Sequence, residues 1–135
     1  MNPHSRHERG VSLSSFLVTV VMALLLMGGL VVDGGAQSAA SRECQQVAAE
    51  AARAATDAPA LARASGVAPS TTAMVAAARH VLAGHPGIAG TVGVSGGRVS
   101  VDTRASAETV FLSMVGVRSL PASGHAVAVL KGSGE

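Results

Sequence analysis

An uncharged apolar segment near the N-terminus limits the folds open to this chain more than any other feature. Residues 11–32 contain no charged side chain, and most are leucine, valine or methionine. As a helix rising about 1.5 Å per residue, the segment is roughly 33 Å long, enough to cross a hydrocarbon core of about 30 Å. Its serine and threonine hydroxyls can bond back to helix carbonyls, so they do not prevent insertion. We therefore predict a transmembrane helix over residues 11–32.

The flanks of this segment predict its orientation. Arg6 and Arg9 precede it, whereas Asp33 and a neutral stretch follow it. Under the positive-inside rule, the tail 1–10 is cytoplasmic and the rest of the chain lies outside the cytoplasmic (inner) membrane. A cleaved signal peptide is the alternative, because residues 34–36 are small. Signal sequences have apolar regions of about 7 to 15 residues, however, so we favour a retained single-pass anchor.

The composition of the whole chain excludes several functional classes. A single cysteine rules out a disulfide scaffold or a cysteine-based zinc site. Aromatic residues make up 1% of the chain, which leaves no platform for stacking bases and few of the rings that small-ligand pockets usually use. The net charge of +2 is spread without runs, so no basic stripe is present. We expect the membrane as a partner, and neither a nucleic acid nor a small-molecule substrate.

Alanine dominates the region after the anchor, residues 33–66. Residues 36–56 lack Pro and Gly and favour a helix. Small side chains recur there at spacings of four and three, and we call this stripe the helix-packing seam: Ala40, Cys44, Val47, Ala51 and Ala54. Such a stripe lets a neighbouring helix approach closely. We expect a bend at residues 34–35, and a further short helix that begins at Pro59 and ends at Gly66.

Residues 67–135 are predicted to form a small α+β head that begins with a helix. Ser70 or Thr71 can cap a helix over residues 73–82, whose apolar face consists of Met74, Ala78, Val81 and Leu82. Gly84 follows this helix where a left-handed C-terminal residue is expected.

The rest of the head has the period of strands. Residues 91–94 and 98–103 alternate and are separated by a glycine-rich turn at 95–97, which predicts a hairpin. Residues 108–117 are too densely apolar for alternation and predict a short helix or an apolar loop. A third antiparallel strand follows Pro121. The predicted fold class is α+β: a transmembrane helix continuing into the alanine-rich helix, then a head with one helix and about three strands.

We find no catalytic, cofactor-binding or metal-binding constellation in the sequence. Residues 93–97 match the nucleophile-elbow pattern, with Asp102 and His125 following Ser95 in hydrolase order. An elbow needs a helix after the serine, whereas a strand follows here, so we interpret the match as a hairpin turn. The chain is therefore expected not to be an enzyme.

Isolated polar residues also favour structural interpretations. The five histidines, His4, His7, His80, His85 and His125, lack metal-ligand spacing and are interpreted as surface residues. Asp33 has no evident partner and is interpreted as a solvated carboxylate at headgroup level. Cys44 lies on the seam and is interpreted as a small buried side chain, with an intermolecular disulfide as the alternative.

Several short motifs, taken in order, give the chain a family resemblance. They combine a basic-glycine junction before the apolar helix, an alanine-rich helix after it, and a closing strand, short helix and strand. The motifs are Glu8-Arg9-Gly10, Val31-Val32-Asp33-Gly34-Gly35, Gln45-Gln46, Ala48-Ala49-Glu50-Ala51-Ala52, Val99-Ser100-Val101, Phe111-Leu112, Val115-Gly116-Val117 and Ala126-Val127-Ala128. In this order they resemble the TadE/TadG-like family of Tad (tight-adherence, Flp) pilus-assembly proteins. The alanine-rich, lysine-poor composition is typical of a GC-rich actinobacterium.

The resemblance implies a function that the residues alone do not. It implies a non-catalytic, bitopic minor-pilin or pseudopilin-like protein that packs against pilins or other assembly proteins. It also implies a prepilin processing site at Gly10 and Val11, but Ser15 replaces the glutamate that processed chains carry, so we expect the N-terminus to be retained. The alternative function is a membrane-anchored extracytoplasmic binding or scaffolding protein unrelated to pili.

Overall fold

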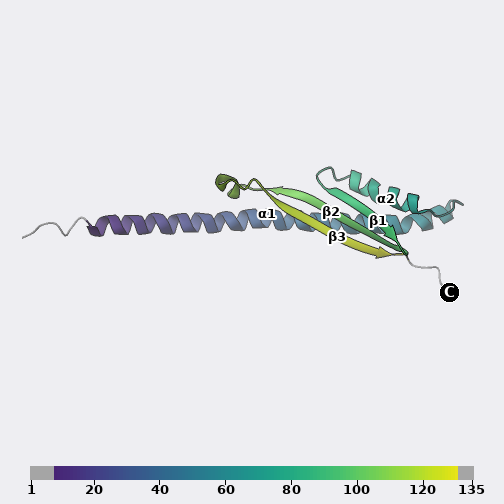
Figure 1. Cartoon of the computed structure of the whole chain (residues 1–135), viewed down its shortest axis with the longest axis horizontal. Helices are drawn as coiled ribbons and strands as arrows, with labels where there is room; N and C mark the ends of the chain where they lie inside the picture. Colours follow the sequence, from purple (N-terminus) through teal and green to yellow (C-terminus); the bar gives the residue numbers. More distant parts are fainter. Residues whose placement is uncertain (1–7, 131–135) are drawn as a thin grey trace, which may run out of the picture.

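The structure, a computed structural model, describes residues 8–130, with side chains from residue 13 onward. One very long helix carries a small sheet and a second helix (Figure 1). In chain order the elements are α1 (Glu8–Ala64), α2 (Thr71–Ala83), β1 (Ala89–Ser95), β2 (Arg98–Glu108), the 3-10 helix η1 (Leu112–Val115) and β3 (Ser119–Val129). The predicted α+β fold class is confirmed.

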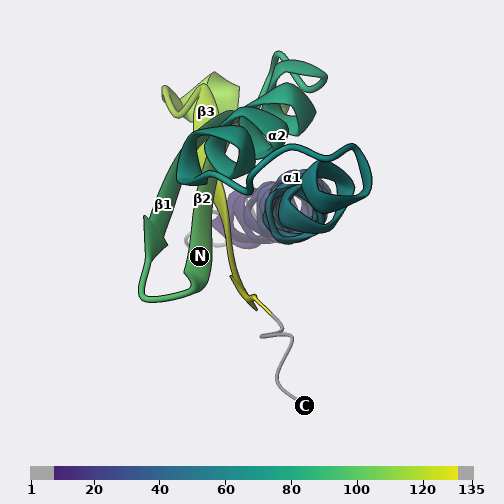
Figure 2. The ribbon, with the colours of Figure 1, turned by 90° about the vertical axis from the view of Figure 1, so that its right-hand side faces the viewer.

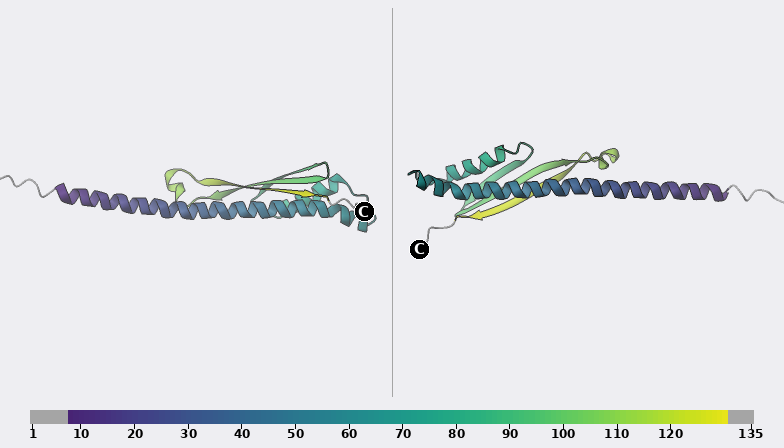
Figure 3. Two further views of the ribbon diagram at one scale, coloured as in Figure 1. Left: turned by 90° about the horizontal axis from the view of Figure 1, so that it is seen from below. Right: turned by 180° about the vertical axis from the view of Figure 1, so that it is seen from behind.

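Helix α1 is continuous over 57 residues, so the predicted bend at Gly34 and Gly35 is wrong. Figure 3 shows it running the length of the molecule without a break. Two glycines weaken a helix by only about 1 kcal/mol each. The residues on both sides of them are held by the head: Asp33 binds the segment around η1, and the Gln37 side chain donates a hydrogen bond to the Pro121 carbonyl at 3.0 Å. These contacts hold the helix on both sides of the two glycines.

The C-terminal end of α1 also differs from the prediction. Pro59 lies inside the helix and is buried, rather than starting a new one. It removes one backbone hydrogen bond but does not end the helix. The end at Gly66 is confirmed: Gly66 has φ +72°, its N–H bonds to the Arg63 carbonyl, and the Val67 N–H bonds to the Ala62 carbonyl. This pair of bonds is the Schellman arrangement that a left-handed glycine permits.

The three strands form an antiparallel meander in the order β1-β2-β3. Both helices lie on one side of the sheet (Figure 2). The side chains of the central strand β2 therefore alternate between buried and exposed. Val99, Val101 and Thr103 are buried against the helices, whereas Arg98 and Asp102 are exposed on the other face. A one-sided core of this kind gives the alternation that the sequence shows.

Most local predictions for the head are confirmed. The Ser70 side chain accepts a hydrogen bond from the Ala73 N–H as the N-cap of α2, and Met74, Ala78 and Leu82 are buried. Gly84 is different: with φ −70° it is right-handed, and α2 ends instead in short turns through residues 84–88. The predicted left-handed residue at this position is wrong.

The hairpin and the last strand also follow their sequence patterns. Ser95 pairs with Arg98, so Gly96 and Gly97 alone form the turn, both with positive φ, as a two-residue turn of this hand requires. Strand β3 begins before Pro121, which the sheet tolerates because β3 is an edge strand. The apolar segment between β2 and β3 contains η1, the short helix that the sequence allowed.

The helix-packing seam lies against the head of the same chain. Cys44, Val47 and Ala51 are almost completely buried in a core shared with α2 and the sheet, and Ala40 and Ala54 are half-buried. The seam therefore does permit close packing, but its neighbours are α2 and the sheet of the same chain rather than a helix of another protein. Small side chains allow a sheet to approach as closely as a helix, and the sequence does not distinguish the two.

Strand β3 lies very close to α1 at Gly124. A Cβ atom at this position would collide with the backbone of Cys44 and Gln45. The Thr103 hydroxyl donates to the carbonyls of Cys44, at 2.8 Å, and Gly124, at 3.2 Å. The Gln45 amide pairs with both backbone groups of His125, at 2.6 and 3.1 Å. Together these contacts attach the edge strand to the helix and protect its unpaired backbone groups.

We predict that Gly124→Ala lowers the free energy of unfolding by about 1–3 kcal/mol, because the new methyl group forces β3 away from α1. The matched control is Gly35→Ala, where a Cβ meets nothing within 4 Å. Alanine there should stabilise the helix by about 0.5–1 kcal/mol. Thermal unfolding of the full chain in detergent, followed by circular dichroism, measures both. Equal effects of the two substitutions would contradict the proposed contact.

Candidate membrane-interface site

The Asp33 carboxylate forms the centre of a site that sequence analysis did not predict. Asp33 is 1% exposed, and its oxygens accept hydrogen bonds from the backbone N–H groups of Val110 at 2.8 Å and Leu112 at 2.6 Å, with a longer contact of 3.4 Å from Phe111. The interpretation of Asp33 as a solvated carboxylate is therefore wrong. Its partners are backbone groups that lie 77 or more residues further along the chain, and no side-chain pattern indicates them.

The segment that Asp33 binds, residues 109–117, is a compact loop around η1, and we call it the η1 loop. Thr109 closes it through its N–H, which bonds to the Arg118 carbonyl, and through its hydroxyl, which bonds to the Val117 carbonyl. Gly116 has φ +94° and reverses the chain after η1. Asp33 accepts from amides at the start of η1, as a capping carboxylate does at a helix N-terminus.

The η1 loop packs on the N-terminal half of α1. A Cβ at Gly29 would lie 2.7 Å from the Phe111 Cβ, so only glycine at position 29 leaves room for the Phe111 side chain. Beside this contact is an apolar groove of about 260 Å³ between the helix and the loop. Its lining residues are Met22, Leu25, Leu26, Leu30, Phe111, Leu112, Met114 and Val115.

Helix and loop together present a large apolar surface. Side chains at consecutive positions of α1, such as Phe16, Leu17 and Val18, are each more than 60% exposed, so the helix before the η1 loop is uncovered on all its faces. In the described part of the chain, α1 is the one helix long and apolar enough to cross a membrane. The site therefore lies where a candidate membrane span meets the head.

The environment of Asp33 changes its acidity. Burial alone raises its pKa, but the hydrogen bonds from the backbone of Leu112, Val110 and Phe111 outweigh this effect and lower the pKa below its ordinary value of 3.8. The carboxylate is thus ionised at neutral pH, which is the form that accepts all three bonds.

The three residues of the nucleophile-elbow match do not come together. The Asp102 carboxylate lies 2.7 Å from His125 Nδ1 across strands β2 and β3, on the exposed face. Thr91 is the cross-strand neighbour of Asp102, and Ser95 lies four residues further along β1, roughly 13 Å away at about 3.3 Å per residue. A strand follows Ser95, as the hairpin interpretation predicts.

The remaining residues singled out in the sequence form no catalytic or metal site in the described part of the chain, and two of them lie outside it. Among residues 8–130, no three His, Cys, Asp or Glu side chains cluster as a metal site would require. Cys44 is buried and unpaired with another cysteine. Gly10 and Val11 belong to the first turns of α1, and their processing stays a prediction. His4 and His7 lie outside the described residues.

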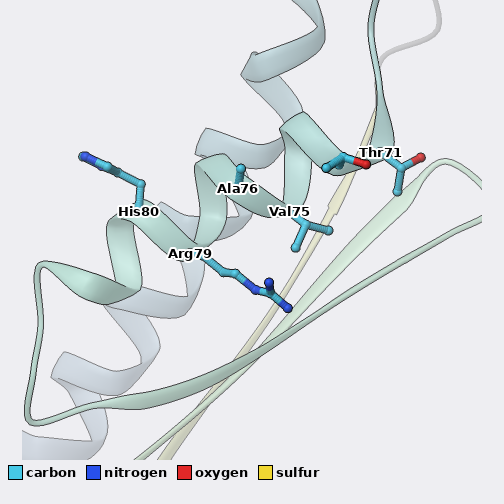
Figure 4. A pocket seen from close by; sticks show the side chains of 6 residues that line it. Thr71, Val75, Ala76, Arg79 and His80 are labelled. Atoms are coloured by element: carbon cyan, nitrogen blue, oxygen red, sulfur yellow. The ribbon is translucent and has the colours of Figure 1, made fainter.

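A hollow on α2 does not have the features of a ligand site. All its lining side chains come from one helix, including Thr71, Val75, Arg79 and His80 (Figure 4). Arg79 and His80 point in different directions, so no polar groups converge there. Ligand sites usually enclose their ligand between several elements.

Comparisons with protein-family models, with curated proteins and with solved structures find no match to this chain.

We predict that Asp33→Asn loosens the η1 loop without unfolding the head. An amide has one acceptor oxygen and presents an N–H₂ group to the backbone donors, so it cannot replace both carboxylate oxygens. Amide hydrogen exchange at Val110 and Leu112 should accelerate by about tenfold or more. Asp57→Asn is the control, because Asp57 is exposed on the same helix. Unchanged exchange in Asp33→Asn would show that the carboxylate does not hold the loop.

The lowered pKa of Asp33 predicts a dependence on pH. Because the folded state holds the carboxylate ionised, its contribution to stability is complete well above the ordinary pKa of 3.8 and is lost as the pH falls through the lower pKa of the folded state. Exchange protection of the η1 loop should thus stay constant from about pH 7 to 5 and fall below about pH 4. The pH dependence should be absent in Asp33→Asn. A loss of protection between pH 7 and 5 would contradict this assignment.

Proposed function

We propose that this protein is a single-pass, non-catalytic component of Tad (Flp) pilus assembly, with minor-pilin-like architecture, in the inner membrane. One observation carries the proposal: the apolar N-terminal part of α1 projects beyond a head built on the C-terminal half of the same helix, with most of its side chains exposed (Figure 1). The resemblance to TadE/TadG-like proteins implies this arrangement. Pilin-type subunits reside in the membrane and pack through such helices.

Retention of the anchor is supported by the position of the small residues after it. Gly34, Gly35 and Ala36 lie inside an unbroken helix rather than in an extended segment. Cleavage there would also remove Asp33, which holds the η1 loop. The arginines before the span favour a cytoplasmic N-terminus and an external head.

A surface for partner helices lies on the face of α1 opposite the head. At 100° per residue, Gly29, Asp33 and Cys44 fall on one stripe, and Leu24, Gly28 and Gly35 fall on the other side. Leu24 is 63% exposed, and a Cβ at Gly28 or Gly35 would meet nothing within 4 Å. Glycines between larger side chains let a second helix approach closely. This face takes the role first expected of the buried seam.

We predict that a photo-crosslinking residue at Leu24 captures another single-pass subunit in cells that express the complete gene neighbourhood. Gly28→Leu should reduce the yield by at least about fivefold, since the added side chain holds the helices apart. Ala60→Leu is the control, because Ala60 is exposed at the head end of α1. The crosslinked product is identified by mass spectrometry.

The identity of the product decides between the two candidate functions. A partner encoded beside a secretion ATPase, two polytopic platform proteins and a short pilin supports pilus assembly. A partner from an unrelated envelope system supports the scaffolding alternative. A yield unchanged by Gly28→Leu would contradict the assignment of the packing face.

A further inference from the structure

We propose that the η1 loop is inserted among the lipid acyl chains of the bilayer half nearest the head. The loop then forms a second, re-entrant membrane contact beside the transmembrane helix. This inference rests on the proposed function only in requiring that the anchor crosses a membrane. It does not depend on pili.

The position of the loop along α1 sets its depth. It packs against Leu25, Leu26 and Gly29. A span needs about 20 residues, so any placement within residues 11–32 puts these positions inside the hydrocarbon. Leu25 lies about 12 Å below Asp33, at about 1.5 Å per residue. The loop is therefore at the depth of acyl chains, while Asp33 lies near the boundary.

The side chains of the loop match that environment. None of residues 109–117 is charged. The nearest charged residues are Glu108, directly before the loop, and Arg118, directly after it, where the loop joins β2 and β3. Met114 is 83% exposed and Val115 is 66% exposed. In water, a loop of this composition would leave an apolar patch exposed to solvent, which is unfavourable.

The backbone of the loop matches the same environment. In lipid, polar backbone groups must be paired within the protein. The N–H groups of Val110, Phe111 and Leu112 bond to Asp33, and those of Met114, Gly116 and Val117 bond to carbonyls within the loop. The Ser113 hydroxyl donates to the Val110 carbonyl. Asp33 thus supplies the acceptors that allow a non-helical segment to enter the hydrocarbon.

Lipid accounts for the exposed surface better than a single protein partner does. The apolar side chains surround α1 on every face and continue onto the loop, whereas one partner helix would cover a single face. The groove between helix and loop is narrow and almost wholly apolar, and at about 260 Å³ it accommodates part of an acyl chain. We therefore assign lipid as the occupant and treat a covering protein as an outcome of the test.

The test places an environment-sensitive fluorophore on the loop of the full chain in lipid vesicles. In a Cys44→Ala background, Met114→Cys is labelled and the protein is reconstituted in phosphatidylethanolamine and phosphatidylglycerol. Leu17→Cys reports on the anchor, and Val127→Cys on the exposed face of β3. We expect the label at residue 114 to be quenched by lipids that carry a spin label on the acyl chain. Its quenching by aqueous iodide should be at least about tenfold weaker than at residue 127, because hydrocarbon excludes the ion.

Each other outcome has a distinct meaning. Iodide quenching at residue 114 equal to that at residue 127 would place the loop in water and overturn the inference. Protection from both quenchers would place the loop beneath protein, such as a second copy, and would also overturn it. If the label at residue 17 is itself open to iodide, the anchor does not insert and the proposed function fails as well. Adding Asp33→Asn should raise iodide quenching at residue 114 and leave residue 17 unchanged.

Discussion

The close contact between α1 and strand β3 is the interaction on which the rest of the structure depends. Gly124 brings β3 against the helix backbone, and Thr103 and Gln45 hold it there through hydrogen bonds. A chain with two phenylalanines and no other aromatic residue cannot fill a wide core. It forms a thin one instead, in which alanines and a glycine bring backbones together and each small side chain gains dense contacts.

The thin core also positions the head relative to the candidate membrane span. Because the sheet lies along α1 rather than beyond its end, the turn between β2 and β3 extends back toward the N-terminus and reaches the apolar half of the helix (Figure 1). Asp33 fixes it there by accepting backbone hydrogen bonds. The head and the candidate membrane span are thus one mechanical unit, and a tilt of the helix in the membrane would move the head with it.

Local patterns were sufficient to predict the elements of the head. Alternation predicted the strand in which Val99 and Val101 are buried, a glycine-rich turn predicted the hairpin, and Gly66 marked the end of α1. Predictions that depended on one residue's propensity were less successful. Gly34 and Gly35 do not bend α1, Pro59 does not start a helix, and Gly84 is not left-handed, because contacts with the head or a short turn outweigh preferences of about 1 kcal/mol.

By itself, the sequence determined the apolar span, the fold class and the presence of a closely packed seam, since these follow from hydrophobic period and side-chain size. Only the tertiary structure decided what occupies the seam and what Asp33 binds. Small side chains specify a close approach but not which backbone approaches, so the sheet and helix α2 of the same chain occupy the seam. The partners of Asp33 are main-chain N–H groups, which every residue except proline has. Only the folded chain brings those near residue 111 to the carboxylate, so the sequence does not indicate them.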